Sequence, residues 1–365
     1  MSAARYVWKQ VALNASKPGP ISRSSHAISS IGNKVFLLGG EHVARTPIDS
    51  TVYEFTADRD TWDVVEVVSG EAPSHRIAHG QAVIGSKIYV FGGRQGIHMD
   101  EKPLNDLHCF DTSTRVWSGS IPYISGEPPS ARSFHKMVSV GDMLYVFGGC
   151  AADGRQKDIH SFNTLTGVWA ALEKSLDIAG RGGPSFAAVN TGTIVDGTTS
   201  DSLMVTAGFS GQENNDMHMY NIASDSWSPS VTLPYRARSV CPTTTISKGK
   251  YVLLFGGEVN ISDRGHEGAG DFSNDIVCID SATGTILKCT NITEGSDASK
   301  CPPARGWTEM ATLGSKSNSS SILTLSGSHC ESAHSVLLFG GLTGNDENPQ
   351  RLGDTWLLTI VIDDK

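Results

Sequence analysis

Long apolar runs are missing from this chain of 365 residues. No stretch approaches the roughly 20 consecutive apolar residues that a membrane-spanning helix needs, and the N-terminal segment lacks the continuous apolar core of a secretory signal. Lysine and arginine form no dense run, and the formal net charge is −9. Because anionic membranes and nucleic acids bind clustered cations, the sequence predicts a cytoplasmic protein with neither kind of partner.

Standard catalytic and metal-binding motifs are missing as well. The seven cysteines are irregularly spaced and include no C-x-x-C pair, so they indicate neither a zinc site nor a thioredoxin-like motif. The chain contains no G-x-S-x-G, no phosphate loop and no H-E-x-x-H. These absences leave open whether the protein is an enzyme.

Glycine, in contrast, is abundant and occurs in pairs. Apolar runs of β-favouring residues, such as IYVFGG and LYVFGG, end in a pair of small residues six times along the chain. The pairs occupy residues 39–40, 92–93, 148–149, 207–208, 256–257 and 340–341. Such runs have the length and composition of buried strands. Their recurrence predicts a repeat architecture with one continuous core.

Further landmarks recur with the glycine pairs. A second apolar run follows each pair, and in four copies a polar residue and an aspartate announce it, as in NDLHCFD, KDIHSFN, NDMHMYN and NDIVCID. A tryptophan closes four of the copies: Trp62, Trp117, Trp169 and Trp227. An arginine precedes every pair, and in the first three copies it stands 16 positions before the first glycine.

These landmarks resemble the kelch repeat. The resemblance implies an all-β fold, a six-bladed kelch β-propeller with four antiparallel strands per blade that forms a single domain over residues 1–365. The blades are expected at residues 22–68, 75–123, 131–176, 180–232, 237–290 and 304–361. Blade six lacks a fourth strand of its own, so residues 5–12, which carry Trp8, are expected to pair into it and close the ring.

One face of the predicted disc gathers the arginines. In an antiparallel blade, the first strand begins on the side where the second strand ends, so the arginines and the residues after the glycine pairs share a face. The set is Arg23, Arg76, Arg132, Arg181, Arg238 and Arg305, with Arg94 after the second pair. Such a rim predicts binding of a sulfate, phosphate, carboxylate or acidic peptide. The alternative is structural, with each arginine bonded to loop carbonyls or neighbouring carboxylates.

The loop after the fifth glycine pair has a different character. Glu258, Asp263 and His266 offer two carboxylates and one imidazole on this short loop. That donor set suits Fe(II), Mn(II) or Zn(II) with open coordination positions. The alternative is a hydrogen-bonded loop in which Asp263 caps a turn and Glu258 pairs with an arginine of the rim.

Four segments resemble the specifier proteins of glucosinolate breakdown, a plant group of nitrile-specifier, epithiospecifier and thiocyanate-forming proteins. The segments are the FGGR that ends at Arg94, ARSFH at 131–135, FGGEV…SDRGHEGAG at 255–270 and RGW at 305–307. The family holds Fe(II) with a Glu-x3-Asp-x3-His pattern. Glu258 and His266 match this pattern, whereas Ser262 takes the middle position and Asp263 follows it. The resemblance also implies that Arg94 and Arg132 hold the sulfated aglucone.

Two hypotheses follow from these patterns. The first is a kelch propeller that serves as a binding scaffold and presents its arginine-rimmed face to a small anion or to an acidic peptide or protein. The alternative is an Fe(II)-dependent specifier-like protein that redirects the breakdown of a glucosinolate-type aglucone to nitriles or related products.

Overall fold

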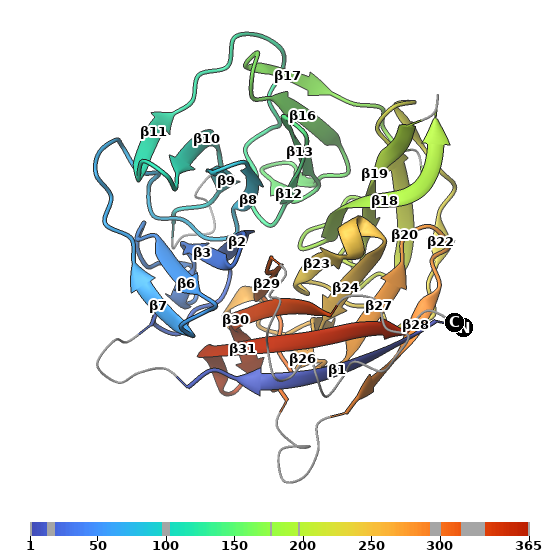
Figure 1. The fold of residues 1–365 in the computed structure, drawn as a ribbon. Coiled ribbons are helices and arrows are strands. Elements are labelled where there is room, and N and C mark those ends of the chain that lie inside the picture. Colours follow the sequence, from blue (N-terminus) through green and yellow to red (C-terminus); the bar gives the residue numbers. More distant parts are fainter. Residues whose placement is uncertain are drawn as a thin grey trace.

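The structure is a computed structural model, and it describes residues 2–12, 19–96, 103–175, 177–195, 198–292, 301–314 and 333–363. The described residues form an all-β disc in which sheets are arranged around a central axis (Figure 1). Within these ranges, no helix has the length and apolar character required to cross a membrane.

Three four-stranded antiparallel sheets, the first three blades, come from the first half of the chain. Blade one consists of β2 (Ala27–Ile31), β3 (Lys34–Leu38), β6 (Tyr53–Thr56) and β7 (Thr61–Val64). Blade two consists of β8 (Gly80–Ile84), β9 (Lys87–Gly93), β10 (Leu104–Asp111) and β11 (Val116–Ser120). Blade three consists of β12 (Lys136–Val140), β13 (Met143–Phe147), β16 (Ile159–Asn163) and β17 (Val168–Ala171).

The second half of the chain forms the other three blades. Blade four consists of β18 (Ser185–Val195), β19 (Thr198–Thr206), β20 (Asp216–Asn221) and β21 (Ser226–Trp227), with β22 (Val231–Thr232) also paired to β20. Blade five consists of β23 (Thr243–Ile246), β24 (Tyr251–Phe255), β27 (Ile276–Asp280) and β28 (Ile286–Asn291). Blade six consists of β29 (Glu309–Thr312), β30 (His334–Gly344), β31 (Pro349–Asp363) and β1 (Ala3–Gln10).

Small hairpins and short turns lie on the two faces of the disc. The hairpins follow the first, third and fifth glycine pairs and are β4 (Glu41–Val43) with β5 (Thr46–Pro47), β14 (Cys150–Ala151) with β15 (Gly154–Arg155), and β25 (Glu258–Asn260) with β26 (Asp271–Phe272). Two short 3-10 turns are η1 (Ser247–Gly249), between β23 and β24, and η2 (Gly265–Glu267), between β25 and β26. The hairpins and η2 therefore lie on the face where the second strands end.

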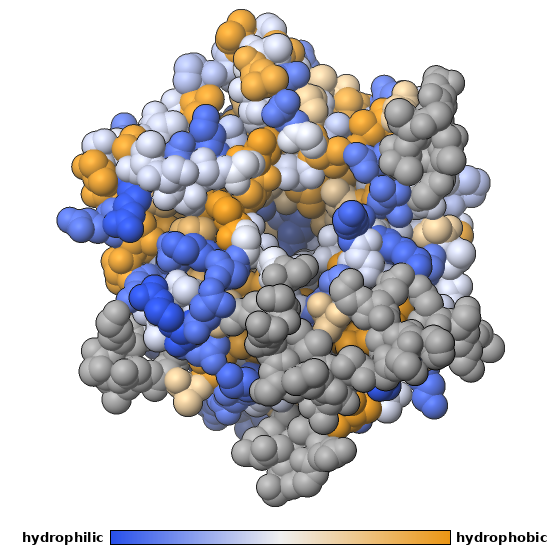
Figure 2. Space-filling view, viewed as in Figure 1, coloured by the Kyte–Doolittle hydropathy of each residue, from blue (hydrophilic) through white to orange (hydrophobic). Residues whose placement is uncertain are grey.

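The first strands of the blades, β2, β8, β12, β18, β23 and β29, contact one another in a closed ring around the axis. Serine and threonine hydroxyls of these strands line a central channel of about 300 Å³. Figure 2 shows the face on which η1 lies, and its centre is hollowed where the channel opens.

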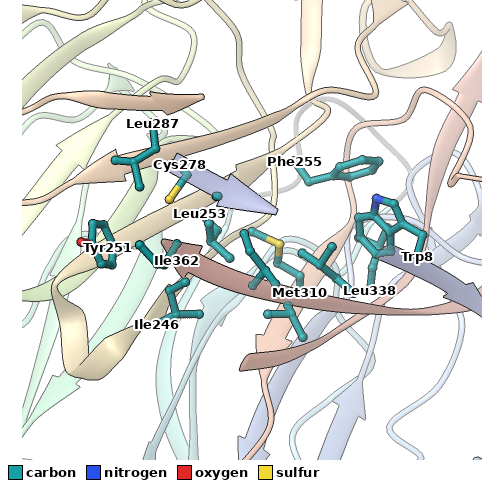
Figure 3. Packing of buried hydrophobic residues seen from close by; sticks show 14 of the residues in the cluster. Trp8, Ile246, Tyr251, Leu253, Phe255, Cys278, Leu287, Met310, Leu338 and Ile362 are labelled. Carbon is teal, nitrogen blue, oxygen red and sulfur yellow. The ribbon is translucent and has the colours of Figure 1, made fainter. Parts of the chain in front are cut away.

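The strand that completes blade six comes from the other end of the chain. β1 pairs antiparallel with β31, from Ala3 opposite Asp363 to Gln10 opposite Trp356, and its first residues also pair parallel with β28 of blade five. Trp8 is buried, with its ring centroid 5.2 Å from that of Phe255 and 6.4 Å from that of Trp356. Figure 3 shows Trp8 within the apolar cluster that joins the two blades.

The glycine pairs allow neighbouring blades to meet backbone to backbone. The N–H of Gly40 donates to the carbonyl oxygen of Arg76 in the next blade at 3.1 Å, and the same bond recurs around the disc up to Gly341 and Arg23. A Cβ atom on Gly39 would lie 2.6 Å from that Arg76 carbonyl oxygen. A side chain at this position would therefore separate the blades.

Candidate ligand-binding site

The six arginines before the glycine pairs are buried, with at most 1% of each residue exposed. In every blade the arginine Nη1 donates to the carbonyl oxygen of the first residue of the blade's own pair, at 2.7 to 3.0 Å. Each Nε donates to the carbonyl oxygen two residues earlier. The set comprises Arg23, Arg76, Arg132, Arg181, Arg238 and Arg305.

In five blades, an aspartate of the third strand or just before it completes the arrangement. Arg132 donates to both oxygens of Asp158, at 2.6 and 2.9 Å, and His160 contacts the same carboxylate at 2.9 Å. Burial alone would raise the pKa of Asp158, but the bonds from His160 and Arg132 outweigh it and hold the pKa well below the ordinary value. The equivalent pairs are Arg76–Asp106, Arg181–Asp216, Arg238–Asp275 and Arg305–Asp354.

Blade one departs from this arrangement. The closest carboxylate oxygen to Arg23 is that of Asp49, at 3.9 Å, and the guanidinium carbon lies 5.1 Å from the Tyr53 ring centroid. Arg23 is nevertheless fully buried. The structure therefore corrects the exposed arginine rim expected from the sequence: these six side chains hold the first strand, the glycine pair and, in most blades, the third strand together.

A ring of backbone hydrogen bonds surrounds the axis just beyond these arginines. The residue two positions after each arginine has a left-handed φ of 46 to 56°, and its N–H donates to the equivalent carbonyl of the preceding blade at 2.8 to 3.0 Å. The bonds close a circle through Ser25, Ala78, Phe134, Gly183, Val240 and Trp307. The axis is thereby encircled by six residues in fixed conformations, and several of their side chains line the cavity on this face.

This cavity has a volume of about 400 Å³. Its wall is in large part apolar, with Ile77, Phe134, Phe209, Val240, Ile261 and Trp307. Three arginines from consecutive blades also line it: Arg45 of blade one, Arg94 of blade two and Arg155 of blade three. The guanidinium carbon of Arg155 lies 4.7 Å from the Phe209 ring centroid, a cation–π contact that orients the side chain. The cavity therefore combines an apolar wall with a group of cations.

The loop after the fifth glycine pair forms another part of the cavity wall. Asp346 of blade six accepts hydrogen bonds from the Ser262 hydroxyl and from the backbone N–H groups of Asp263 and Ala269. His266 reaches blade one, where its Nε2 lies 3.0 Å from Oε2 of Glu41. Contacts with two other blades therefore hold this loop at the cavity.

An aromatic group forms where this loop meets the apolar wall. The ring centroids of Phe134, Trp307 and His266 lie 4.9 to 5.6 Å apart, with tilted or edge-on planes. Such edge-on packing is favourable for aromatic rings. The cavity consequently has a firm aromatic surface next to the loop.

The three predicted metal ligands do not converge. Glu258 and His266 line the cavity, whereas Asp263 is exposed and lies outside the lining. Glu258 accepts the N–H of Gly270 at 3.3 Å, and His266 contacts Glu41. Among the described residues, no group of three or more His, Cys, Asp and Glu side chains is placed to hold a metal ion. In this arrangement the residues do not fit a metal centre.

Glu258 is a buried acid in the wall of a cationic cavity. Burial raises the pKa of its carboxyl to about 7, and the neighbouring carboxylate of Glu213 adds to the effect. At neutral pH, Glu258 therefore carries less negative charge than an exposed glutamate.

Sequence reasoning found one of the three cavity arginines and missed two. Arg94 was expected on this face, and it lies in the cavity wall. Arg45 and Arg155 were missed, although both belong to hairpins that follow a glycine pair, β4–β5 and β14–β15. The rule that residues after the pairs share one face would have located both.

Comparison with known proteins finds similarity to a kelch-repeat domain, to a plant sulfolyase and to a Kelch domain-containing protein. Residues 25–257 match the model described as KLHDC2/KLHL20/DRC7 Kelch-repeats domain. The chain is 31% identical over 278 residues to N-(sulfonatooxy)prop-2-enimidothioate sulfolyase of Thlaspi arvense, covering 72% of this chain and 78% of that protein. It is 27% identical over 269 residues to human Kelch domain-containing protein 3, covering 69% of this chain and 64% of that protein.

Proposed function

The chain belongs to the kelch-repeat family of the KLHDC2/KLHL20/DRC7 Kelch-repeats domain, and we propose that it binds a small organic anion in the cavity lined by Arg45, Arg94 and Arg155. The observation that carries this proposal is the meeting of three arginines and an apolar wall in one cavity of about 400 Å³. Ligand sites are commonly cavities of about 300–1,000 Å³ with apolar walls and a few placed polar groups.

The chemistry of the lining defines the class of ligand. Arginine offers paired donors that match the oxygens of sulfate, phosphate and carboxylate. Three arginines also create a local positive field on a chain whose formal net charge is −9. Phe134, Trp307 and Phe209 favour an apolar group attached to that anion. An acidic peptide end offers similar chemistry, which keeps a protein partner within the proposal.

We test this proposal with 4-nitrophenyl sulfate, which joins an aromatic ring to an anion. Isothermal titration should show binding of this probe, and weaker binding of inorganic sulfate and of 4-nitrophenol, because each comparator uses one half of the cavity. Arg94→Ala and Arg155→Ala should each raise the Kd about tenfold or more, as expected for a lost charge-assisted hydrogen bond. Equal affinities in the wild type and both variants, or no binding of the probe, would contradict the proposal.

As a second candidate, we propose that the chain redirects the breakdown of a glucosinolate-type aglucone to nitriles or related products. The sulfolyase relative acts, by its name, on N-(sulfonatooxy)prop-2-enimidothioate, which carries a sulfate group and a short apolar chain. In nitrile formation the N–O bond breaks and its electron pair leaves with the sulfate, while the C–S bond pair becomes the third carbon–nitrogen bond and the sulfur departs as elemental sulfur. Arginines beside the departing sulfate would stabilise its developing charge.

Product analysis separates this candidate from simple binding. An allyl glucosinolate and a thioglucosidase would release the aglucone in the presence or absence of the protein, and gas chromatography would measure the ratio of nitrile to isothiocyanate. We expect the protein to raise this ratio and Arg155→Ala to reduce the effect. An unchanged ratio at excess protein would leave binding as the function.

Iron binding by Glu258, Asp263 and His266 stays a prediction from the sequence, and the described arrangement of these side chains does not support it. Elemental analysis of protein purified without oxygen tests it directly. One iron per chain, lost in His266→Ala, would establish a metal centre on this loop. Absence of iron from both the wild type and the His266→Ala variant would contradict a metal centre on this loop.

A further inference from the structure

Arg45 occupies a turn whose backbone conformation suits glycine better than arginine. It lies at the tip of the β4–β5 hairpin with a φ of 62°. In the hairpins after the third and sixth glycine pairs, the residue with positive φ beside the turn is glycine: Gly154 at the start of β15 has a φ of 122°, and Gly344 at the end of β30 has a φ of 99°. Residues other than glycine are uncommon in this region because of steric strain.

The surroundings of Arg45 show what its side chain reaches. The Arg45 N–H donates to Oε2 of Glu41 at 2.6 Å, which fixes the turn. The side chain lines the cavity, and its Nη1 lies 3.8 Å from Oε1 of Glu267 in η2. The Arg45 side chain is 17% exposed and that of Glu267 is 57% exposed. An ion pair this long and this accessible to water is weak.

We infer that Arg45 determines anion specificity together with Arg94 and Arg155, and that Glu267 competes with the ligand for it. The inference rests on the proposed function of the cavity. The anionic group of a ligand and the Glu267 carboxylate are alternative partners for the Arg45 guanidinium. A ligand whose anion reaches the blade-one side of the cavity replaces the weak pair with a shielded, charge-assisted contact.

The strained turn provides a variant that separates ligand binding from folding. Arg45→Gly removes the guanidinium and places glycine where a left-handed φ costs it nothing. The Kd of 4-nitrophenyl sulfate should rise about tenfold, while the melting temperature should stay the same or increase.

The chain offers a matched control for this variant. Arg115 also has a left-handed φ, 59°, but it lies in an exposed turn of blade two and does not line the cavity. Arg115→Gly makes the same change in charge and backbone. It should affect the melting temperature in the same direction and leave the Kd unchanged.

Removing the competitor should have the opposite effect on affinity. Glu267→Gln frees Arg45 from its carboxylate partner, so the Kd should fall about threefold, in keeping with the modest strength of exposed ion pairs. The exposed Glu127 controls for net charge, since Glu127→Gln removes the same charge outside the cavity lining. In the Arg45→Gly background, Glu267→Gln should give no gain in affinity.

The results separate this inference from the proposed function. If Arg155→Ala weakens binding and Arg45→Gly does not, the cavity binds anions but the inference about Arg45 is wrong. A fall in both melting temperature and affinity for Arg45→Gly, without a similar fall for Arg115→Gly, would make Arg45 a structural residue and overturn the inference. Absence of probe binding to the wild type would overturn the proposed function as well.

Discussion

The arginines of the propeller fall into two groups that differ in burial. Arg132 and its five equivalents are buried and bonded within their own blades, whereas Arg155 is exposed and lines the cavity. Removing one member of a buried ion pair is costly, because the charge of the other member remains uncompensated and poorly solvated. The two groups should therefore respond differently to substitution.

Arg132→Met should destabilise the protein by about 3 kcal/mol, because the Asp158 carboxylate and the Gly148 carbonyl both lose their arginine donor. Arg155→Met should cost about 1 kcal/mol or less, since it removes a cation–π contact at the surface. Urea unfolding followed by circular dichroism measures both. Equal losses of stability would refute the distinction between the two groups.

Glu258 should make stability depend on pH. Its pKa is raised from 4.5 to about 7 in the fold, so its stabilising contribution is complete below the unfolded pKa and is lost as the pH rises through 7. Glu258→Gln should therefore stabilise the protein by about 2–3 kcal/mol at pH 8 and have little effect at pH 5. Urea midpoints at the two pH values check this, and the same difference at both would contradict it.

At the scale of elements, β1 has more contacts than a terminal segment usually makes. It completes blade six, borders β28 and places Trp8 in the core between two blades. Without it, β31 and β28 would present open edges, which invite pairing with other chains. The closing strand thus protects the sheets on both sides of it.

Removal of residues 2–12 should lower the melting temperature and cause aggregation on size-exclusion chromatography. Trp8→Ala should reproduce part of this effect and cost about 3–5 kcal/mol, as expected for a large core side chain. Lys9→Ala is the control from the same strand, since Lys9 makes an exposed ion pair with Asp60 and should change stability by less than about 1 kcal/mol. Normal stability of the truncated chain would contradict this role of β1.

The second and third strands of the blades were predictable from the sequence, because in each repeat one short apolar run ends in the glycine pair and another follows it. From the sequence, loop carbonyls and neighbouring carboxylates were alternative partners of the arginines, but the particular aspartates were not identified. The aspartate that announces the third strand, as in Asn105-Asp106 and Asn215-Asp216, is the residue that Arg76 and Arg181 bind. An aspartate and an arginine recur together in five repeats, and this joint recurrence indicates a structural pair.

The loop at Glu258 illustrates what local spacing cannot provide. The positions of Ser262, Asp263 and His266 depend on Asp346 in blade six and on Glu41 in blade one. These partners lie 83 and 225 positions away from Asp263 and His266, respectively. The direction of a loop carboxylate is set by such distant partners, so the spacing between donors alone did not predict whether they converge.

At the scale of the whole molecule, three sets of interactions join the blades into one unit. The circle of backbone bonds through Phe134 and Trp307 links each blade to the next. The bonds from the glycine pairs to the arginine carbonyls form a second circle outside it. The closing strand completes the series by joining blades five and six. A local opening in one blade therefore disturbs both neighbours.

This coupling predicts cooperative unfolding of the intact chain. Calorimetry should give one transition whose calorimetric and van't Hoff enthalpies agree, the usual test of two-state behaviour. In the variant without residues 2–12, the backbone circles still join blades five and six, but β28 and β31 lose the strand that lies between them. Opening can therefore begin at these two edges and spread from blade to blade. The transition should then broaden, and the van't Hoff enthalpy should fall below the calorimetric value.

Hydrogen exchange shows where the opening begins. In the truncated chain, amides of β27 and β30 should lose protection before those of β13. Separate transitions in the intact chain, or uniform exchange in the truncated one, would show that the blades are coupled in some other way.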